Sequence, residues 1–182
     1  KRESYWNVPG TYGVLFGQGS MQTNWRLSFD FKPTKTAGSW QTFLRITDNG
    51  AGNERRLLGL WLIPNTLNIR MHYEFDSSDA SRTPRFDTKA ITLNEWNTVD
   101  ISQMVKDGKS ILLFKVNGFI YHNIVNGNPR TYPALDFYSA FGTWRASSGQ
   151  IRDFQFYSSD VASDIPALSG TYGLFWADLV KQ

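Results

Sequence analysis

The most constraining feature of this sequence is an alternation of apolar and polar side chains in short runs that turn residues separate. In the clearest run Trp25, Leu27, Phe29 and Phe31 alternate with polar side chains. A period of two places every second side chain on the same face of a β-strand, and many such runs are typical of a sandwich or barrel. Only residues 158–166 have the composition of a helical turn. The chain is therefore predicted to be all-β, with antiparallel strands in a two-sheet β-sandwich.

Turn residues mark the ends of the predicted strands. Asn117 and Gly118 lie between two apolar runs, and both residue types tolerate the positive φ angles of a tight hairpin turn. Residues 104–109 are expected to form a connection. Further strands are predicted at residues 40–47, 57–63, 67–75, 97–101, 111–116, 119–124, 135–141, 150–157 and 172–179. Because no linker or low-complexity tract interrupts them, we predict one domain over residues 1–182.

Composition excludes several classes of site. The 182 residues contain no cysteine, which excludes disulfides, thiolate metal sites and cysteine nucleophiles. His72 and His122 are the only histidines in the sequence, too few for histidine-rich metal chemistry. A net charge of +3 is too small to predict a nucleic-acid partner. No apolar run approaches the ~20 residues of a membrane span, so membrane insertion is not expected.

Several motifs occur in an order that points to a family. Residues 26–33 and 43–46 precede a segment with Leu93, Trp96 and Val99, and the Asn117–Gly118 hairpin and residues 148–156 follow it. This order resembles the laminin-G-like branch of the concanavalin A-like lectin/glucanase superfamily, over residues 25–157. The resemblance implies a jelly roll of two packed sheets, with a concave face and rim loops. It also implies an extracellular location, or one on a cell or virion surface.

A hairpin around Pro64 and Asn65 predicts which side chains share an outer face. With a two-residue loop, three pairs lie across the core face: Leu58 with Met71, Leu60 with Ile69, and Leu62 with Leu67. The opposite face then holds Trp61, Asn68, Arg70, His72 and Glu74. A Trp ring offers a flat apolar surface to a pyranose, and the polar side chains can bind hydroxyls, a carboxylate or a sulfate. The alternative is a solvated sheet face with cross-strand ion pairs, together with a Trp that a loop covers.

Two loops are further candidate sites. Residues 141–149 place Trp144 and Arg145 among small residues, and an exposed Trp in such a loop is a common ligand platform. The alternative is that Trp144 folds back as a lid on the end of the sandwich. Residues 48–54 carry carboxylate and amide oxygens, which suit calcium, but the same residue types also form ordinary turns. We expect no metal and no other cofactor, with calcium as the alternative at this loop.

Catalytic motifs are incomplete in this sequence. Hydrolases of the resembled superfamily carry a Glu-x-Asp-x-(x)-Glu strand with paired carboxylates. Glu74 and Asp76 match its beginning, but the closing Glu is absent. Lyases on jelly rolls use a His and a Tyr near an Arg or Gln, and His72 with Arg70 matches this only in part. We therefore predict that the chain is not an enzyme.

The predicted function is that of a non-catalytic, lectin-like module that binds extracellular carbohydrate. Its partner would be a glycan or a glycoprotein. The residues expected to contact the ligand are Trp61, Arg70, His72, Glu74, Trp144 and Arg145. The main alternative is an adhesion or structural domain that binds a protein partner through its rim loops. A polysaccharide hydrolase or lyase is the less favoured third hypothesis.

Overall fold

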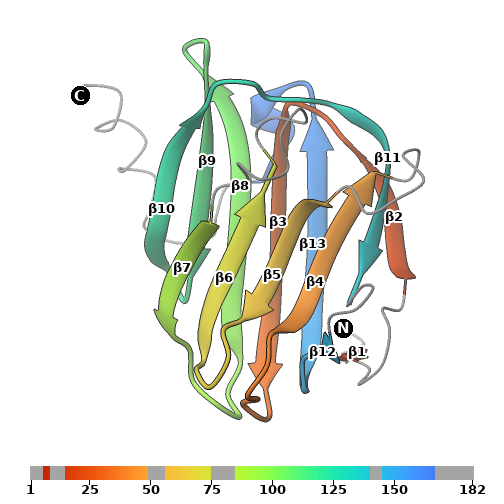
Figure 1. The fold of residues 1–182 in the computed structure, drawn as a ribbon. Coiled ribbons are helices and arrows are strands. Elements are labelled where there is room, and N and C mark those ends of the chain that lie inside the picture. Colours follow the sequence, from red (N-terminus) through yellow and green to blue (C-terminus); the bar gives the residue numbers. More distant parts are fainter. Residues whose placement is uncertain (1–5, 9–14, 49–55, 75–84, 140–144, 167–182) are drawn as a thin grey trace.

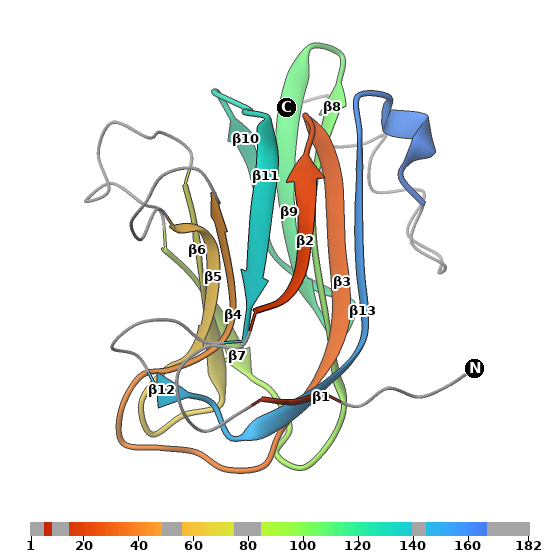
Figure 2. The same ribbon diagram turned by 90° about the vertical axis from the view of Figure 1, so that its right-hand side faces the viewer.

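Two facing β-sheets make up the part of the chain that the computed structural model describes, which is residues 6–8, 15–48, 56–74, 85–139 and 145–166 (Figure 1, Figure 2). Sheet A has the order β1 (Trp6–Val8), β13 (Gly149–Ser159), β3 (Asn24–Pro33), β8 (Asn97–Lys106), β9 (Lys109–Val116), β10 (Phe119–Asn126). Sheet B has the order β2 (Leu15–Met21), β11 (Tyr132–Tyr138), β4 (Gln41–Asp48), β5 (Arg56–Leu62), β6 (Asn68–Tyr73), β7 (Arg85–Ala90). All of these neighbours pair antiparallel, which confirms the predicted all-β sandwich.

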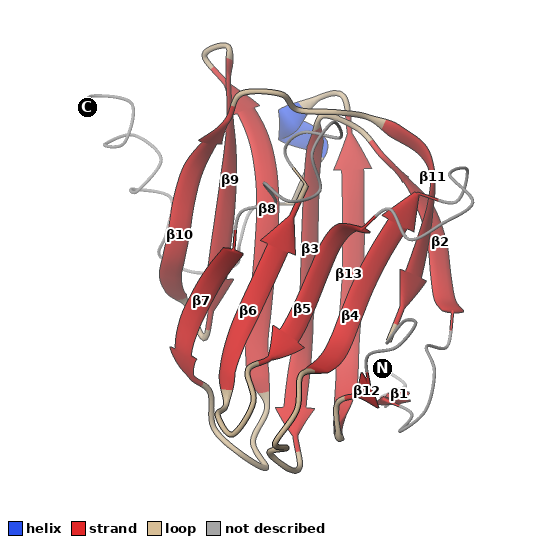
Figure 3. Ribbon diagram, in the orientation of Figure 1, coloured by secondary structure: helices blue, strands red, loops and turns tan. Residues whose placement is uncertain are grey.

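Two short elements complete the described structure. The two-residue strand β12 (Arg145–Ala146) pairs with β4 in parallel. A 3-10 turn, η2 (Ala162–Asp164), follows β13 and is drawn in blue in Figure 3. It confirms the helical turn predicted at residues 158–166. No helix among the described residues is long and apolar enough to cross a membrane.

The core lies between the two sheets and is rich in aromatic rings. On β3 the alternation seen in the sequence becomes an alternation of burial, because Leu27, Phe29 and Phe31 point at sheet B. The Phe31 ring stacks on Phe43 of β4, with centroids 4.2 Å apart and planes within 4° of parallel. Such ring pairs add to the burial of apolar area and fix the spacing of the two sheets at this level.

Two tight turns join β8, β9 and β10. Asn117 and Gly118 have φ angles of 51° and 79°, which confirms the predicted hairpin. Asp107 and Gly108 have φ angles of 51° and 74° and form a second turn of the same kind. Most of residues 104–109, expected as a connection, therefore belongs to strands. The Asp-Gly pair was the signal that the prediction passed over.

The β5–β6 hairpin has a different register from the predicted one. The structure pairs Leu58 with Tyr73, Leu60 with Met71 and Leu62 with Ile69, so each predicted partner was wrong by two residues. The reason is a wider loop: the Ile63 amide donates to the Asn68 carbonyl at 3.0 Å, which leaves residues 64–67 in the turn. Because the shift is even, every side chain stays on its predicted face.

Strand β7 was not predicted from the sequence, and one predicted strand cannot be compared with the structure. Strand β7 alternates Phe86 and Thr88, which are buried, with the exposed residues Arg85, Asp87 and Lys89. The strand was not recognised because three of its six residues are charged and only Phe86 is strongly apolar. The strand predicted at residues 172–179 lies outside the described residues.

Candidate functional site

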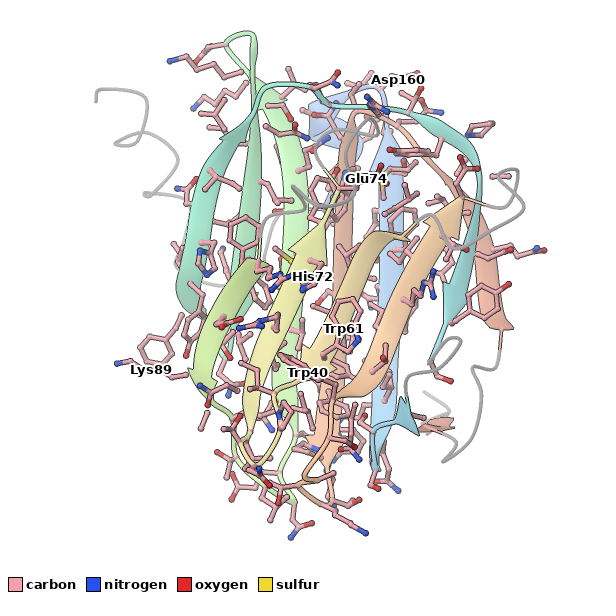
Figure 4. The ribbon with its side chains drawn as sticks, in the orientation of Figure 1. Trp40, Trp61, His72, Glu74, Lys89 and Asp160 are labelled. Atoms are coloured by element: carbon pink, nitrogen blue, oxygen red, sulfur yellow. The ribbon has the colours of Figure 1, made fainter. Side chains whose placement is uncertain are left out.

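The outer face of sheet B brings together three of the predicted site residues. Trp61 of β5 lies opposite Arg70 of β6, and Gly59 lies opposite His72. Figure 4 shows Trp61 and His72 on the face turned toward the viewer, in a row that continues to Trp40 at the lower end. Trp61 is absent from the hydrophobic cluster between the sheets, as expected for a side chain on the outer face.

Trp61 lies flat on the sheet because residue 59 is glycine. A Cβ atom on Gly59 would stand 2.0 Å from Cη2 of Trp61, so no other residue leaves room for this ring position. The His72 ring packs against the indole, with centroids 4.6 Å apart. Trp61 is only 4% exposed. Its ring is therefore packed into the face, whereas the half-buried His72 beside it is more accessible.

Arg70 is held from two sides on the same face. Its Nε and Nη2 donate to the two carboxylate oxygens of Asp87 at 2.6 and 2.5 Å. Its guanidinium carbon lies 4.9 Å from the centre of the Trp40 ring, within cation–π range. The hydrogen bonds from Arg70 hold the pKa of Asp87 below its usual value, and the charges of His122 and His72 act in the same direction.

Trp40 was not among the predicted site residues, although it lies at one end of the row. It is half-buried and belongs to the segment between β3 and β4. The Asn65 amide donates to the Ala37 carbonyl at 2.8 Å, which anchors this segment to the β5–β6 turn. The sequence signal was a Trp after the small residues Gly38 and Ser39, the argument applied instead to Trp144.

A second polar group, also missing from the prediction, lies toward the opposite edge of sheet B. Asp136 of β11 accepts hydrogen bonds from Gln18 Nε2 at 2.8 Å and from the Tyr138 hydroxyl at 3.3 Å. Burial is the main cause that raises the pKa of Tyr138, and the charge of Asp136 adds to it. The buried Arg45 of β4 lies opposite Tyr138 on one side and Gly59 on the other. The arginine therefore lies between the two polar groups.

The other predicted site residues are placed only in part. Glu74 is half-buried at the far end of β6, where its amide donates to the Leu57 carbonyl at 2.9 Å (Figure 4). Arg145 lies in β12 beside Gln41, but its side chain is not among those that the structure describes. The next hydrogen bond, from the Ser147 amide to the Thr42 carbonyl at 2.8 Å, continues the pairing of this segment with β4.

Three further sequence predictions fall outside the described residues. They concern Trp144, Asp76 and most of the candidate calcium loop, residues 49–54. Among the residues that are described, no group of three or more His, Asp or Glu side chains is arranged to hold a metal ion.

Comparisons with known proteins place the fold. No protein-family model matches the chain, and no curated protein matches its sequence. Among solved structures, the CBM40 of the Ruminococcus gnavus IT-sialidase, bound to alpha2,3 sialyllactose, has a TM-score of 0.56 at 15% identity. The match covers 87% of this chain and 96% of that one. The fold is a jelly roll.

Two alginate lyases share the same jelly roll. Alginate lyase A1-II', of polysaccharide lyase family 7, has a TM-score of 0.53 at 14% identity, over 81% of this chain and 66% of that one. Alginate lyase AlyC3 has a TM-score of 0.52 at 11% identity, over 82% and 68%. The chain thus spans about two thirds of the length of the lyases. At these identities the likeness shows the jelly-roll fold alone, so the concanavalin A-like superfamily and its laminin-G-like branch both stay predictions.

Proposed function

We propose that this chain is a carbohydrate-binding module and that its ligand contacts the outer face of sheet B. The observation that supports this is the row formed by Trp40, Arg70, Trp61 and His72. A sugar has an apolar C–H face and a rim of hydroxyls, so it needs ring surfaces beside well-fixed donors and acceptors. Trp40 and His72 supply ring surface, and Arg70 and Asp87 supply charged hydrogen-bonding groups.

Gly59 distinguishes this row from an ordinary solvated face. Glycine inside a strand weakens it by roughly 0.5–1 kcal/mol relative to alanine and marks a close approach by another group. Here that group is the indole of Trp61, which Gly59 admits to within contact of the backbone. A merely solvated face has no need for this arrangement. It does suit a face on which rings lie flat against the sheet.

The ligand we favour carries a carboxylate. Asp87 occupies Nε and Nη2 of Arg70, and among the described residues no partner contacts Nη1. That group can donate to a ligand anion, and an arginine–carboxylate contact is among the stronger hydrogen bonds. Two structural neighbours also fit this choice, because one was solved with sialyllactose and another acts on alginate, and both sugars carry carboxylates.

Binding of a glycan panel that contains sialyllactose and alginate oligosaccharides tests the proposal. We expect Trp40→Ala to weaken binding of the selected glycan by about tenfold or more while the protein stays folded, because a stacking surface is lost. Titration calorimetry measures the affinity, and circular dichroism checks the fold. If the folded wild-type protein binds no glycan of the panel, the proposal fails and a protein partner becomes the better hypothesis.

A polysaccharide lyase is the second candidate, since one neighbouring lyase was solved as a variant with His and Tyr replaced, in complex with its substrate. On the outer face of sheet B, His72 is on β6 and Tyr138 is on β11, with β4 and β5 between them. Three strand spacings of about 4.8 Å separate the two strands by roughly 14 Å. This separation of the strands counts against joint action of the two side chains on one bond. Incubation with alginate should give none of the ultraviolet absorbance of unsaturated uronate ends.

A further inference from the structure

The edge strand β10 is unusual in its lack of charge. Among the described residues it pairs only with β9, so it is the last strand of sheet A. Its side chains Phe119, Ile120 and Val125 are 71%, 39% and 61% exposed. No Asp, Glu, Lys or Arg occurs from Gly118 to Pro129. An edge strand that offers unpaired backbone groups and apolar side chains is a template for another strand.

The edge strand of sheet B, β7, shows how this protein protects an edge. Its exposed side chains include Arg85, Asp87 and Lys89, and its pairing with β6 contains a register shift between Asn68 and Arg70. Charges and irregular pairing both discourage the addition of a further strand. Strand β10 has only a register shift, between Ile120 and His122, and its pairing is regular from His122 to Asn126.

Contacts with β7 hold β10 in a fixed position at one side of the sandwich (Figure 1). The His122 ring lies 4.5 Å from the Phe86 ring, and His122 Nε2 is 3.4 Å from the Asp87 carbonyl oxygen. The inward side of β10 is therefore anchored, while Ile120, Asn123 and Val125 share the outer face of sheet A. A strand presented in this way is ready to pair without rearrangement.

We propose that β10 pairs antiparallel with β10 of a second copy of this chain, so that the two sheets A become continuous. A second copy fits because β10 contains no Asp, Glu, Lys or Arg, so no antiparallel register of β10 against itself brings such side chains of like charge together. It also places the exposed apolar side chains of one copy against those of the other. Such a pairing about a twofold axis closes on itself and gives a dimer.

The mass in solution tests this proposal directly. Light scattering after size-exclusion chromatography should give twice the 20.8 kDa chain mass for the wild-type protein at high concentration. When the regular stretch from His122 to Asn126 pairs with itself, its centre is Ile124, so Val125 of each copy lies near the axis. Val125→Lys should then raise the dimer dissociation constant by about tenfold or more, because the two lysines repel each other. The matched control is Val161→Lys beside η2, where the valine is 54% exposed but lies outside β10, and this variant should stay dimeric.

A charge-complementation arm separates lost pairing from a damaged fold. Val125→Glu alone should also be monomeric, and a mixture of Val125→Lys with Val125→Glu should regain the dimer mass, since opposite charges then meet. A wild-type protein that is monomeric at every concentration overturns the proposal. So does a dimer that Val125→Lys leaves intact.

Discussion

Both outer faces of this sandwich carry an arginine that is paired with an aspartate and stacked on a tryptophan. On sheet B the set is Arg70, Asp87 and Trp40. On sheet A, Arg152 Nε donates to Asp30 at 3.0 Å, and its guanidinium carbon lies 4.2 Å from the Trp96 ring centre. The two sets have the same chemistry, so an arginine between a carboxylate and a ring does not by itself indicate a ligand site.

The surroundings of the two sets differ. On sheet A the aspartate is shared with Thr98, whose hydroxyl donates to it at 2.7 Å, and Lys32 also lies over the Trp96 ring. These contacts tie β3, β8 and β13 together. On sheet B the set continues into the Trp61–His72 pair, which lies above a glycine. What distinguishes the candidate site is therefore the space that Gly59 gives the second ring.

The largest effect should come from filling that space. Gly59→Ala puts a Cβ atom where the Trp61 ring now lies, so the ring must move. We expect an unfolding free energy lower by about 3 kcal/mol, the cost of an overpacked site, together with weaker glycan binding. Urea denaturation measures the stability. Gly127→Ala is the control, since its new Cβ meets nothing within 4 Å, and it should change stability by less than about 0.5 kcal/mol.

A smaller effect should separate the two arginines. Arg70→Ala should weaken glycan binding by about tenfold or more, because a charged hydrogen bond contributes about 1.5–3 kcal/mol. Arg152→Ala, its counterpart on sheet A, should bind with unchanged affinity. Calorimetry with the glycan selected by the panel provides both values. Equal losses in the two variants would show that the comparison of the faces is mistaken.

The smallest effect should be a dependence of stability on pH. Hydrogen bonds from Arg70 lower the pKa of Asp87 from 3.8, so the folded state favours the carboxylate. That contribution is fully present above the unfolded pKa, and it is lost as the pH falls through the lower, folded value. The melting temperature of Asp87→Asn should thus lie below that of wild type at neutral pH and approach it in acid. A constant difference would contradict this assignment.

The sequence predicts the sandwich and much of the candidate face because both depend on local alternation. Trp61, Arg70 and His72 share a face whenever the register of the hairpin shifts by an even number of residues. The error in the predicted loop length therefore left the predicted face unchanged. Trp40 could not be placed in the same way, because its position depends on a hydrogen bond between two separate turns. Asp87 was missed together with its strand.

Two further features of the face depend on contacts that cannot be inferred from the alternation of apolar and polar residues in the sequence. Phe43 and Leu44 are consecutive and both belong to the core between the sheets, where the pairing of β4 with β5 is irregular, and this shift sets which face Arg45 lies on. The low exposure of Trp61 follows from Gly59, which interrupts the apolar run of β5. That interruption was visible in the sequence, but its meaning required the three-dimensional position of the ring.

The register of the β5–β6 hairpin also says which changes in length this region tolerates. Insertion or deletion of two residues in the turn at residues 64–67 moves the cross-strand partners and keeps each ring on its side of the sheet. A change of one residue has to be absorbed within the turn, because a one-residue slip of β6 along β5 would carry Arg70 and His72 into the core and bring Met71 to the surface. Homologues and engineered variants should therefore keep the pairing of Leu62 with Ile69 whatever the length of this turn, because that pairing holds the candidate face on its side of the sheet.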